Sequence, residues 1–437
     1  MSIWSTAVEM AEATPATRNR YIDFLRALSI LVVVIGHWLI AGFLFRGGEV
    51  ESIQVLAAIP STQWLTWLFQ VMPIFFIVGG YSNSVSIISA RRKAQSYGDW
   101  LGGRLDRLIR PLLPLIALWA LVAAGLMVAG IAQPDIQTLT QMALIPIWFL
   151  AIYVMVVLFA PLTYQAWERL GFYSVAAFML LAVVVDIAVF QFGLDWAGWS
   201  NYLWIWLGVH QLGYGWQSGK FKYTGSKTVL VAIAGWLALA ALVFLGPYPL
   251  AMVGSPDPDI SNTLPPKIPL LALAVAQFAI VLLLEERINR WLERVKLWAA
   301  TVLINSMIMT LYLWHITVMI ILVAIAWYFD GAGLALQPGT AEWWMTRPIW
   351  IGVLFLLLFP AAMLLSPMER SGRPNGWQTS NWRLITGAVA ICSGIAGLAM
   401  LGISQEVSAL AVVAIFAGAL LSEVIGLGRR PRNAPTN

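Results

Sequence analysis

Apolar runs of about 20 residues follow one another along most of the chain, and short polar stretches separate them. A helix of this length crosses the hydrocarbon of a lipid bilayer. The pattern indicates about twelve spans, at residues 21–45, 64–88, 110–131, 141–164, 172–192, 201–217, 228–245, 268–284, 298–329, 348–365, 384–401 and 408–425. We therefore expect an all-α fold, a polytopic bundle of transmembrane helices surrounded by lipid.

Composition supports a membrane protein. Hydrophobic residues make up 60% of the 437 positions and charged residues only 11%, which leaves too little polar surface to cover a soluble domain. The chain has one cysteine, Cys392, and it lies inside an apolar run. A disulfide within the chain is therefore excluded and a thiolate-bound metal is not expected, so we predict no metal site.

Basic residues gather in alternate loops between the spans. If the first span enters from the cytoplasm, 22 of the 26 lysines and arginines lie in cytoplasmic loops. Arg46, Lys267 and Arg347 then lie on the opposite side, and the remaining one, Arg26, lies inside a span. Cytoplasmic loops are enriched in these residues, so we expect both termini in the cytoplasm. The net charge of +5 is then explained by orientation, and no nucleic-acid partner is expected.

Three polar side chains share one face of the first predicted span. Arg26 and His37 are eleven positions apart, so they differ by about 20° around a helix and by about 16 Å along it. Asp23 lies on the same face and can pair with Arg26 three positions later. The stripe is expected to run from the cytoplasmic surface to about the middle of the bilayer. Ionisable groups there are costly and indicate function, although Arg26 with Asp23 as counter-ion also fits simple snorkelling to the membrane surface.

The segment IDFLRALSILVVVIGHW resembles the first helix of the acyltransferase-3 family, membrane enzymes that O-acylate surface sugars, lipids and antibiotics in bacteria. The family pattern is an Asp, then Leu-Arg, then ten residues, then a His. Asp23, Leu25, Arg26 and His37 match it in order and spacing. Phenylalanine and alanine replace the two glycines that usually follow the Asp and the Arg.

Five further segments resemble the family in the same order, namely MPIFFIVGGYSNS, DWLGGRLDRLIRPLLPL, IPIWFLAIYVMVVLFAPL, INSMIMTLYLWHITVMI and LLSPMERS. The resemblance covers residues 18–370 and implies a ten-helix acyltransferase core. The last two spans lie outside it and are expected to pack as an appended helix hairpin. We therefore expect a cytoplasmic segment 1–20, an acyltransferase domain 21–370, a transmembrane hairpin 371–426 and a basic cytoplasmic tail 427–437.

The resemblance implies an enzyme of the cytoplasmic membrane that moves an acyl group, in the simplest case acetyl, from acyl-CoA to a hydroxyl. The acceptor is expected to be an envelope glycan, a glycolipid or a related small molecule. Transfer to a hydroxyl needs a base, and the neutral imidazole of His37 is suited to that role. Asp23 is assigned to the same catalytic group. No cysteine nucleophile and no Gly-x-Ser-x-Gly elbow is seen, so we expect direct transfer.

Other residues are assigned by the chemistry of the donor and by the resemblance. Guanidinium groups bind phosphate bidentately, so the expected sites for the phosphates of acyl-CoA are Arg26, Arg104, Arg107 and Arg110. The last three recur every third residue and also fit a strip that faces lipid headgroups. The resemblance adds His315 as a second catalytic residue, with Tyr312, Ser306, Glu369 and Trp148 as further candidates.

Some polar features allow two interpretations. His210 is expected to be structural, Asp186 is either structural or part of a cavity, and the proline-rich loop 246–267 is either a stiff connector or a lid. The main alternative function is a secondary transporter, because twelve spans with both ends inside is a common transporter layout. Against it, the chain lacks a long central loop between its halves, and its polar stripe is concentrated in the first span.

Overall fold

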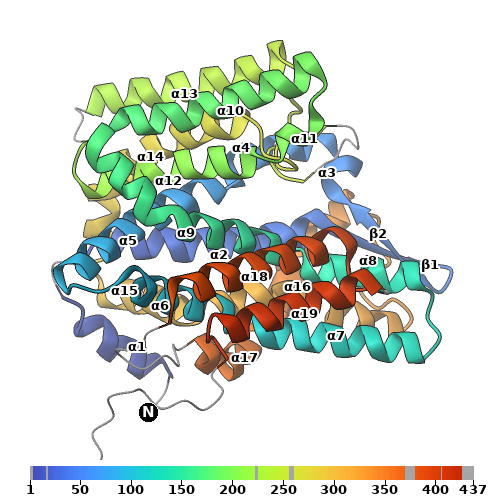
Figure 1. Ribbon diagram of the computed structural model, residues 1–437. Helices are drawn as coiled ribbons and strands as arrows, with labels where there is room; N and C mark the ends of the chain where they lie inside the picture. The colour runs from blue at the N-terminus through green and yellow to red at the C-terminus, as the bar shows by residue number, and fades with distance from the viewer. Residues whose placement is uncertain are drawn as a thin grey trace, which may run out of the picture. The chain divides into compact units, whose positions relative to one another are not determined.

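The computed structural model describes residues 3–15, 18–221, 225–254, 260–369, 379–404 and 406–425. Helices dominate these ranges, and one antiparallel hairpin interrupts them (Figure 1). The longer helices are α1 Ile3–Glu12, α2 Arg20–Ile40, α5 Met72–Arg92, α6 Tyr97–Ile109, α7 Leu112–Val128, α8 Gln133–Leu144, α9 Ile147–Leu170, α10 Phe172–Phe192, α12 Asn201–Gln217, α13 Gly225–Leu245, α14 Pro269–Trp291, α15 Val295–Ser306, α16 Ile308–Tyr328, α17 Ala341–Leu365, α18 Asn381–Leu401 and α19 Glu406–Leu421. The short elements are β1 Ala41–Arg46, β2 Glu49–Gln54, α3 Val55–Ala58, η1 Pro60–Trp64, α4 Leu65–Phe69, α11 Asp195–Gly198 and η2 Ser366–Glu369.

The described residues contain nine helices that are long and apolar enough to cross a membrane. A tenth is added if α6 and α7, bent by 40°, are counted as one span. The all-α, polytopic class is therefore confirmed. The two remaining predicted spans lie on α12 and α19, which have 17 and 16 residues and stand at or just below the lower end of the length range for a full crossing. The count of twelve and the cytoplasmic placement of both ends stay predictions.

The first span is shorter than its apolar run suggested. Helix α2 ends at Ile40, and the apolar residues 41–45 form most of strand β1, which pairs with β2 from Ala41 opposite Gln54 to Arg46 opposite Glu49. The turn consists of Gly47 and Gly48, with φ of 63° and 91°. Two consecutive glycines at positive φ form the tight turn that suits a two-residue hairpin, so this turn chemistry overrides hydropathy here.

A second predicted span is also divided. The run 298–329 was expected to be one helix, but it forms α15 and α16, with a break at Met307 (φ −130°, ψ 23°). His315, expected about five turns into one helix, therefore lies about two turns into α16.

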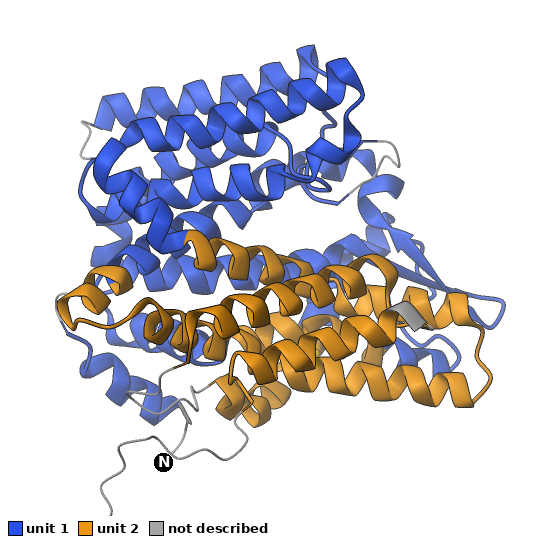
Figure 2. Cartoon of the chain, viewed as in Figure 1, with its two compact units in different colours: residues 1–85, 160–308, 323–351 blue, residues 86–159, 309–322, 352–437 orange. Residues whose placement is uncertain are grey.

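The chain forms two compact units (Figure 2). Unit 1 consists of residues 1–85, 160–308 and 323–351, and within it α13 packs on α14, α10 on α12, and α1 on α15. Unit 2 consists of residues 86–159, 309–322 and 352–437, and within it α18 packs on α19, α6 and α8. The predicted domain boundary at residue 370 and the predicted basic tail 427–437 lie outside the described residues.

Helix α5, which contacts α2 through Ser82, is held in place by a close crossing with α12 in unit 1. A Cβ atom on Gly80 would overlap the carbonyl oxygen of His210, and one on Gly213 would overlap the carbonyl oxygen of Ile77. Small residues allow backbones to approach this closely in membrane bundles. One turn beyond Gly80, Asn83 Nδ2 lies 3.0 Å from His210 Nε2. The fully buried His210 thus takes part in a helix–helix hydrogen bond, as its structural interpretation anticipated.

Candidate active site

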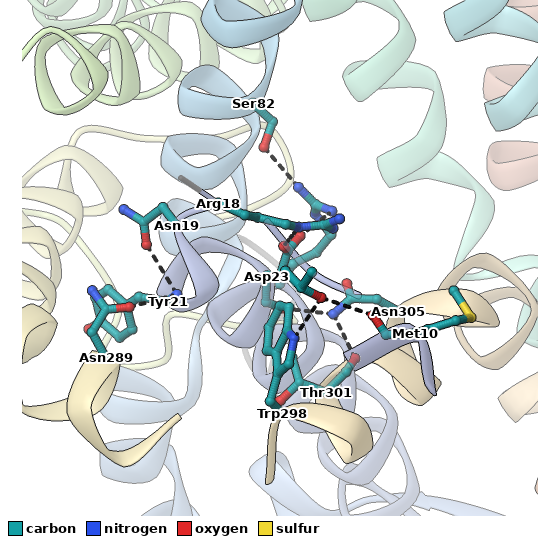
Figure 3. Close-up of polar contacts among 12 residues, drawn as sticks. Met10, Arg18, Asn19, Tyr21, Asp23, Ser82, Asn289, Trp298, Thr301 and Asn305 are labelled. Atoms are coloured by element: carbon teal, nitrogen blue, oxygen red, sulfur yellow. Dashed lines mark hydrogen bonds and ion pairs between the residues drawn. The ribbon is translucent and has the colours of Figure 1, made fainter. Parts of the chain in front are cut away.

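The start of α2 holds a network of charged and neutral polar side chains that we call the first-helix cluster: Arg18, Asp23, Arg26, Ser82 and Asn305. The carboxylate of Asp23, which is only 6% exposed, accepts from Arg18 Nε at 2.6 Å and from Arg26 Nη1 at 3.3 Å. Arg26 Nη2 donates to Ser82 Oγ on α5 at 2.8 Å (Figure 3). The predicted ion pair of Asp23 and Arg26 therefore forms. Arg18 adds a second ion pair to Asp23, and Ser82 adds a hydrogen bond to Arg26.

Neighbouring elements hold the beginning of α2 in place. Asn19 caps the helix, because its side chain accepts from the backbone N–H of Tyr21 at 3.1 Å. Asn305 Nδ2 on α15 donates to the carbonyl of Asp23 and to that of Thr301, both at 2.9 Å (Figure 3). Ser82 on α5 thus holds the Arg26 guanidinium, and Asn305 on α15 holds the backbone of α2 at Asp23. No sequence spacing indicates either contact.

His37 lies at the other end of the same helix. It is half-buried and belongs to the last turn of the 21-residue α2, where its carbonyl accepts the N–H of Ala41 at the start of β1. The separation from Arg26 along the axis remains about 16 Å. His37 is thus only three residues from the end of α2, because the hairpin begins at Ala41. Its expected depth near the middle of the bilayer stays a prediction. Asp23 and His37 are therefore far apart on α2, as their spacing required.

Unit 2 holds a second group of candidates, which we call the late-helix cluster: Trp148, Thr310, Tyr312, His315 and Glu369. The side chain of His315 is fully buried, and its Nδ1 lies 2.6 Å from the carbonyl oxygen of Tyr312. A carbonyl oxygen only accepts, so Nδ1 carries the hydrogen and the neutral ring has its lone pair on Nε2. His315 therefore has the tautomer that a base acting through Nε2 requires.

Contacts within unit 2 fix the ring of Tyr312. Its hydroxyl donates to the carbonyl of Pro146, and its ring meets Phe149 edge-on at a centroid distance of 5.7 Å. Trp148 is half-buried and packs edge-on against Phe149 at 6.4 Å. The segment at the start of α9 thus lies against the turn of α16 that holds Tyr312 and His315. Their assignment to one functional site stays a prediction.

Glu369 closes the start of α16. Its carboxylate accepts from the backbone N–H of Met309 at 3.3 Å, from that of Thr310 at 2.7 Å, and from the Thr310 hydroxyl. A carboxylate is favoured there, because the first N–H groups of a helix lack partners within the helix and carry partial positive charge. Glu369 therefore positions the helix that carries Tyr312 and His315.

Ser306 is separated from these residues by the break at Met307. It is the last residue of α15, it is exposed, and its hydroxyl donates to the carbonyl of Leu303 in its own turn at 2.7 Å. In the described parts of the chain, its hydroxyl makes no hydrogen bond to another candidate residue. The single long helix that placed Ser306 beside Tyr312 and His315 does not exist.

The three arginines near the end of α6 have different surroundings. Arg104 lies over the ring of Trp100 at 5.9 Å, and Arg107 is exposed. Arg110 Nη2 donates to the buried carboxylate of Asp106 at 2.6 Å and to the carbonyl of Val424 at 2.9 Å. Arg110 thus fastens the predicted C-terminal hairpin to α6, a contact that the sequence did not reveal, and Arg107 is the most accessible of the three.

Asp186 on α10 is buried and accepts three hydrogen bonds, from Asn201 Nδ2 at 2.8 Å, from Tyr248 Oη at 3.0 Å and from the N–H of Ile268 at 2.9 Å. Burial and the charge of Asp186 raise the pKa of Tyr248 above its ordinary value. Burial lowers the pKa of Lys267, against the opposing charge of Asp186. Asp186 therefore anchors both ends of the loop between α13 and α14, which favours its structural interpretation.

Within the described ranges, no three His, Cys, Asp or Glu side chains lie close enough together to hold a metal ion.

The sequence and the structure were also compared with known proteins. A family model described as an acyltransferase domain matches residues 19–359 of the 437. Curated proteins and solved structures gave no match. The matched range contains α2 and α16, and the family indicates a membrane acyltransferase. This chain belongs to the acyltransferase-3 family.

Proposed function

We propose that this protein is an O-acyltransferase of the cytoplasmic membrane, which moves an acyl group from cytoplasmic acyl-CoA to a hydroxyl of an envelope glycan, a glycolipid or a related small molecule. The observation that carries the proposal is the arrangement on α2. A guanidinium fixed by two partners lies on one face of the helix, and an imidazole lies on the same face about 16 Å farther along.

The first-helix cluster suits the phosphates of the donor. Two guanidinium groups share the single carboxylate of Asp23, so this group of three keeps one positive charge. The side chain of Arg18 is 54% exposed and that of Arg26 is 30% exposed. Each guanidinium has five N–H groups, so donors remain for phosphate oxygens after the bonds to Asp23 and Ser82. Arg107 is a further candidate for the same role, because it is exposed.

His37 is proposed as the base. The acceptor oxygen bonds to the acyl carbon as the carbon–sulfur bond of the thioester breaks, and His37 takes the hydroxyl proton and passes it to the departing thiolate. The pantetheine arm of CoA separates its thioester from its phosphates, which fits a base placed well away from Arg26. His315 is the second candidate, because its lone pair lies on Nε2.

Transfer of a labelled group tests this function. Membranes that contain the protein are incubated with acetyl-CoA labelled in the acetyl group, and the products are extracted with and without mild alkali. We expect alkali-labile label in an ester, formed by the unaltered protein and strongly reduced in a His37→Ala variant present at the same level. A carrier that only transports solutes forms no ester. Absence of label with acetyl-CoA and with longer acyl-CoA donors would contradict the proposal.

A further inference from the structure

Arg347 is a buried cation that the donor site and the base do not use. It lies in the second turn of α17, in unit 1, and is only 7% exposed. Its guanidinium lies over the ring of Trp343 at 4.2 Å and over that of Trp350 at 5.3 Å. Its only hydrogen bonds within the described residues run from Nε to the carbonyl of Trp343 at 3.2 Å and from Nη2 to Thr346 Oγ1 at 3.3 Å.

A carboxylate partner for Arg347 is missing from the part of the chain that the structure describes. An isolated buried charge is costly, and such groups are normally paired. Stacking on indole rings compensates for only part of that cost. In a membrane protein, an ionisable group left in this state indicates a functional site.

Trp350, one turn farther along α17, also has a buried polar group without a hydrogen-bond partner in the described residues. Its side chain is 9% exposed, and its buried indole N–H has no acceptor among the described residues. A buried tryptophan N–H usually finds a partner. Two neighbouring buried groups therefore both offer hydrogens, since the Arg347 guanidinium has five N–H groups and donates two of them.

The chemistry of these donors specifies the ligand. A planar guanidinium matches the two oxygens of a carboxylate or a phosphate and neutralises their charge. A neutral hydroxyl accepts hydrogen bonds but leaves the buried charge uncompensated, and a metal cation is repelled. The indole rings of Trp343 and Trp350 also offer flat apolar surfaces beside the guanidinium. The expected ligand is therefore an oxyanion carried by an organic molecule.

The β1–β2 hairpin places Arg347 and Trp350 at the same end of unit 1 as His37. The N–H of Phe45 on β1 donates to the carbonyl of Leu334 at 2.9 Å, and Trp327 Nε1 donates to the carbonyl of Gly48 at 3.0 Å. The hairpin continues directly from α2, and residues 329–340 lead directly into α17 (Figure 1). His37 lies in the last turn of α2, and Arg347 lies in the second turn of α17.

We propose that Arg347 and the indole N–H of Trp350 bind an anionic group, a carboxylate or a phosphate, on the acceptor that receives the acyl group. The identity of the ligand as the acceptor rests on the proposed function, whereas the anion site itself does not. The acceptor is then an acidic glycan or a phosphorylated glycolipid, whose charge is held at Arg347 while its hydroxyl reaches the base.

Binding of defined probes tests the anion site without catalysis. The full-length protein in nanodiscs of phosphatidylcholine is titrated with glucose, glucuronic acid and glucose 6-phosphate, and tryptophan fluorescence and thermal stability are recorded. We expect saturable binding of one or both acids and none of glucose. Arg347→Gln should weaken this binding at least about tenfold, and Trp350→Phe, which keeps the ring but removes the N–H, should weaken it by a smaller factor.

A second arm replaces part of the phosphatidylcholine by phosphatidylglycerol. Arg347-dependent stabilisation by this lipid alone identifies a lipid-borne phosphate as the ligand, and stabilisation by the soluble acids identifies a sugar acid or sugar phosphate. Arg46→Gln is the matched control, because it removes an exposed positive charge from the hairpin at the same end of unit 1. Arg347→Lys checks that a loss of binding does not reflect misfolding, since it retains the charge.

The outcomes separate the two proposals. Arg347-dependent anion binding without ester formation from acyl-CoA supports the anion site and contradicts the acyl-transfer function. Ester formation with unchanged anion binding in Arg347→Gln supports the function and overturns the anion site. Equal loss of binding in Arg347→Gln and Arg46→Gln also overturns it, because nonspecific attraction to positive charge then explains the result.

Discussion

Replacement of Arg26 by alanine tests whether Arg26 binds the donor while His37, farther along α2, acts as the base. The change removes the guanidinium that Asp23 and Ser82 hold, but Asp23 keeps its 2.6 Å ion pair with Arg18. The buried carboxylate is therefore not left unpaired, and the fold should survive. A hydrogen bond to a charged group contributes about 1.5–3 kcal/mol, which corresponds to about 10- to 150-fold in a dissociation constant.

The expected result is a donor defect. In Arg26→Ala, the dissociation constant for acyl-CoA should rise within that range, and saturating donor should restore most of the turnover. In His37→Ala, donor binding should stay nearly unchanged, while single-turnover rates fall by about 10²- to 10⁴-fold, as is usual for a lost general base. The dissociation constant is measured by titration with acyl-CoA, and the single-turnover rate by rapid mixing, both in the same nanodisc preparation.

Ser82→Ala is the matched control. It removes one hydrogen bond from Arg26 without changing the charge, so donor binding should weaken only a few-fold. Size-exclusion profiles of all three variants must match that of the unaltered protein. The reasoning is refuted if Arg26→Ala binds the donor normally and loses turnover even at saturation. Near-normal turnover in His37→Ala would instead move the base to His315.

Three more outcomes are expected from the packing. Gly80→Ala should prevent α5 from packing on α12, because its Cβ would overlap a backbone oxygen of α12, whereas the Cβ of Gly103→Ala in α6 meets open space. Equal yields of the two folded variants in size exclusion would contradict this. Glu369→Gln should lower the unfolding temperature, because the charged cap of α16 contributes about 1 kcal/mol, and an unchanged thermal melt would disprove the cap. Gly418→Val should separate α19 from the backbone of α18, seen as faster proteolysis of the C-terminal hairpin, and an unchanged cleavage rate would show that the crossing tolerates the side chain.

Local periodicity was sufficient to predict much of α2 and part of the site. The pair of Asp23 and Arg26 follows from their spacing on a helix, and so does the shared face with His37. The end of the helix was missed, because the apolar run 41–45 outweighed the glycine pair that follows it. Gly47-Gly48 is a known hairpin signal, so this error was avoidable.

Other features depend on residues far apart in the sequence. Nothing local marks the break at Met307, and the carboxylate that caps α16 comes from Glu369, about 60 positions later. The bond from Arg110 to Val424 joins residues 314 positions apart, so periodicity cannot indicate it. Arg347 was classed as a loop charge on the non-cytoplasmic side, and only the structure places its guanidinium, buried, over the rings of Trp343 and Trp350.

The long-range anchoring of α2 affects how the enzyme matures. The helix is synthesised early, yet the Tyr21 hydroxyl donates to Val281, 260 positions later, and Asn305 donates to the carbonyl of Asp23 across 282 positions. At the opposite end, Trp327 donates to the hairpin at Gly48 across 279 positions. Contacts of such high sequence separation form late in folding. A nascent chain therefore carries Arg26 and His37 on an unanchored helix until most of the domain has been inserted, so acyl-transfer capacity should emerge only with nearly complete synthesis.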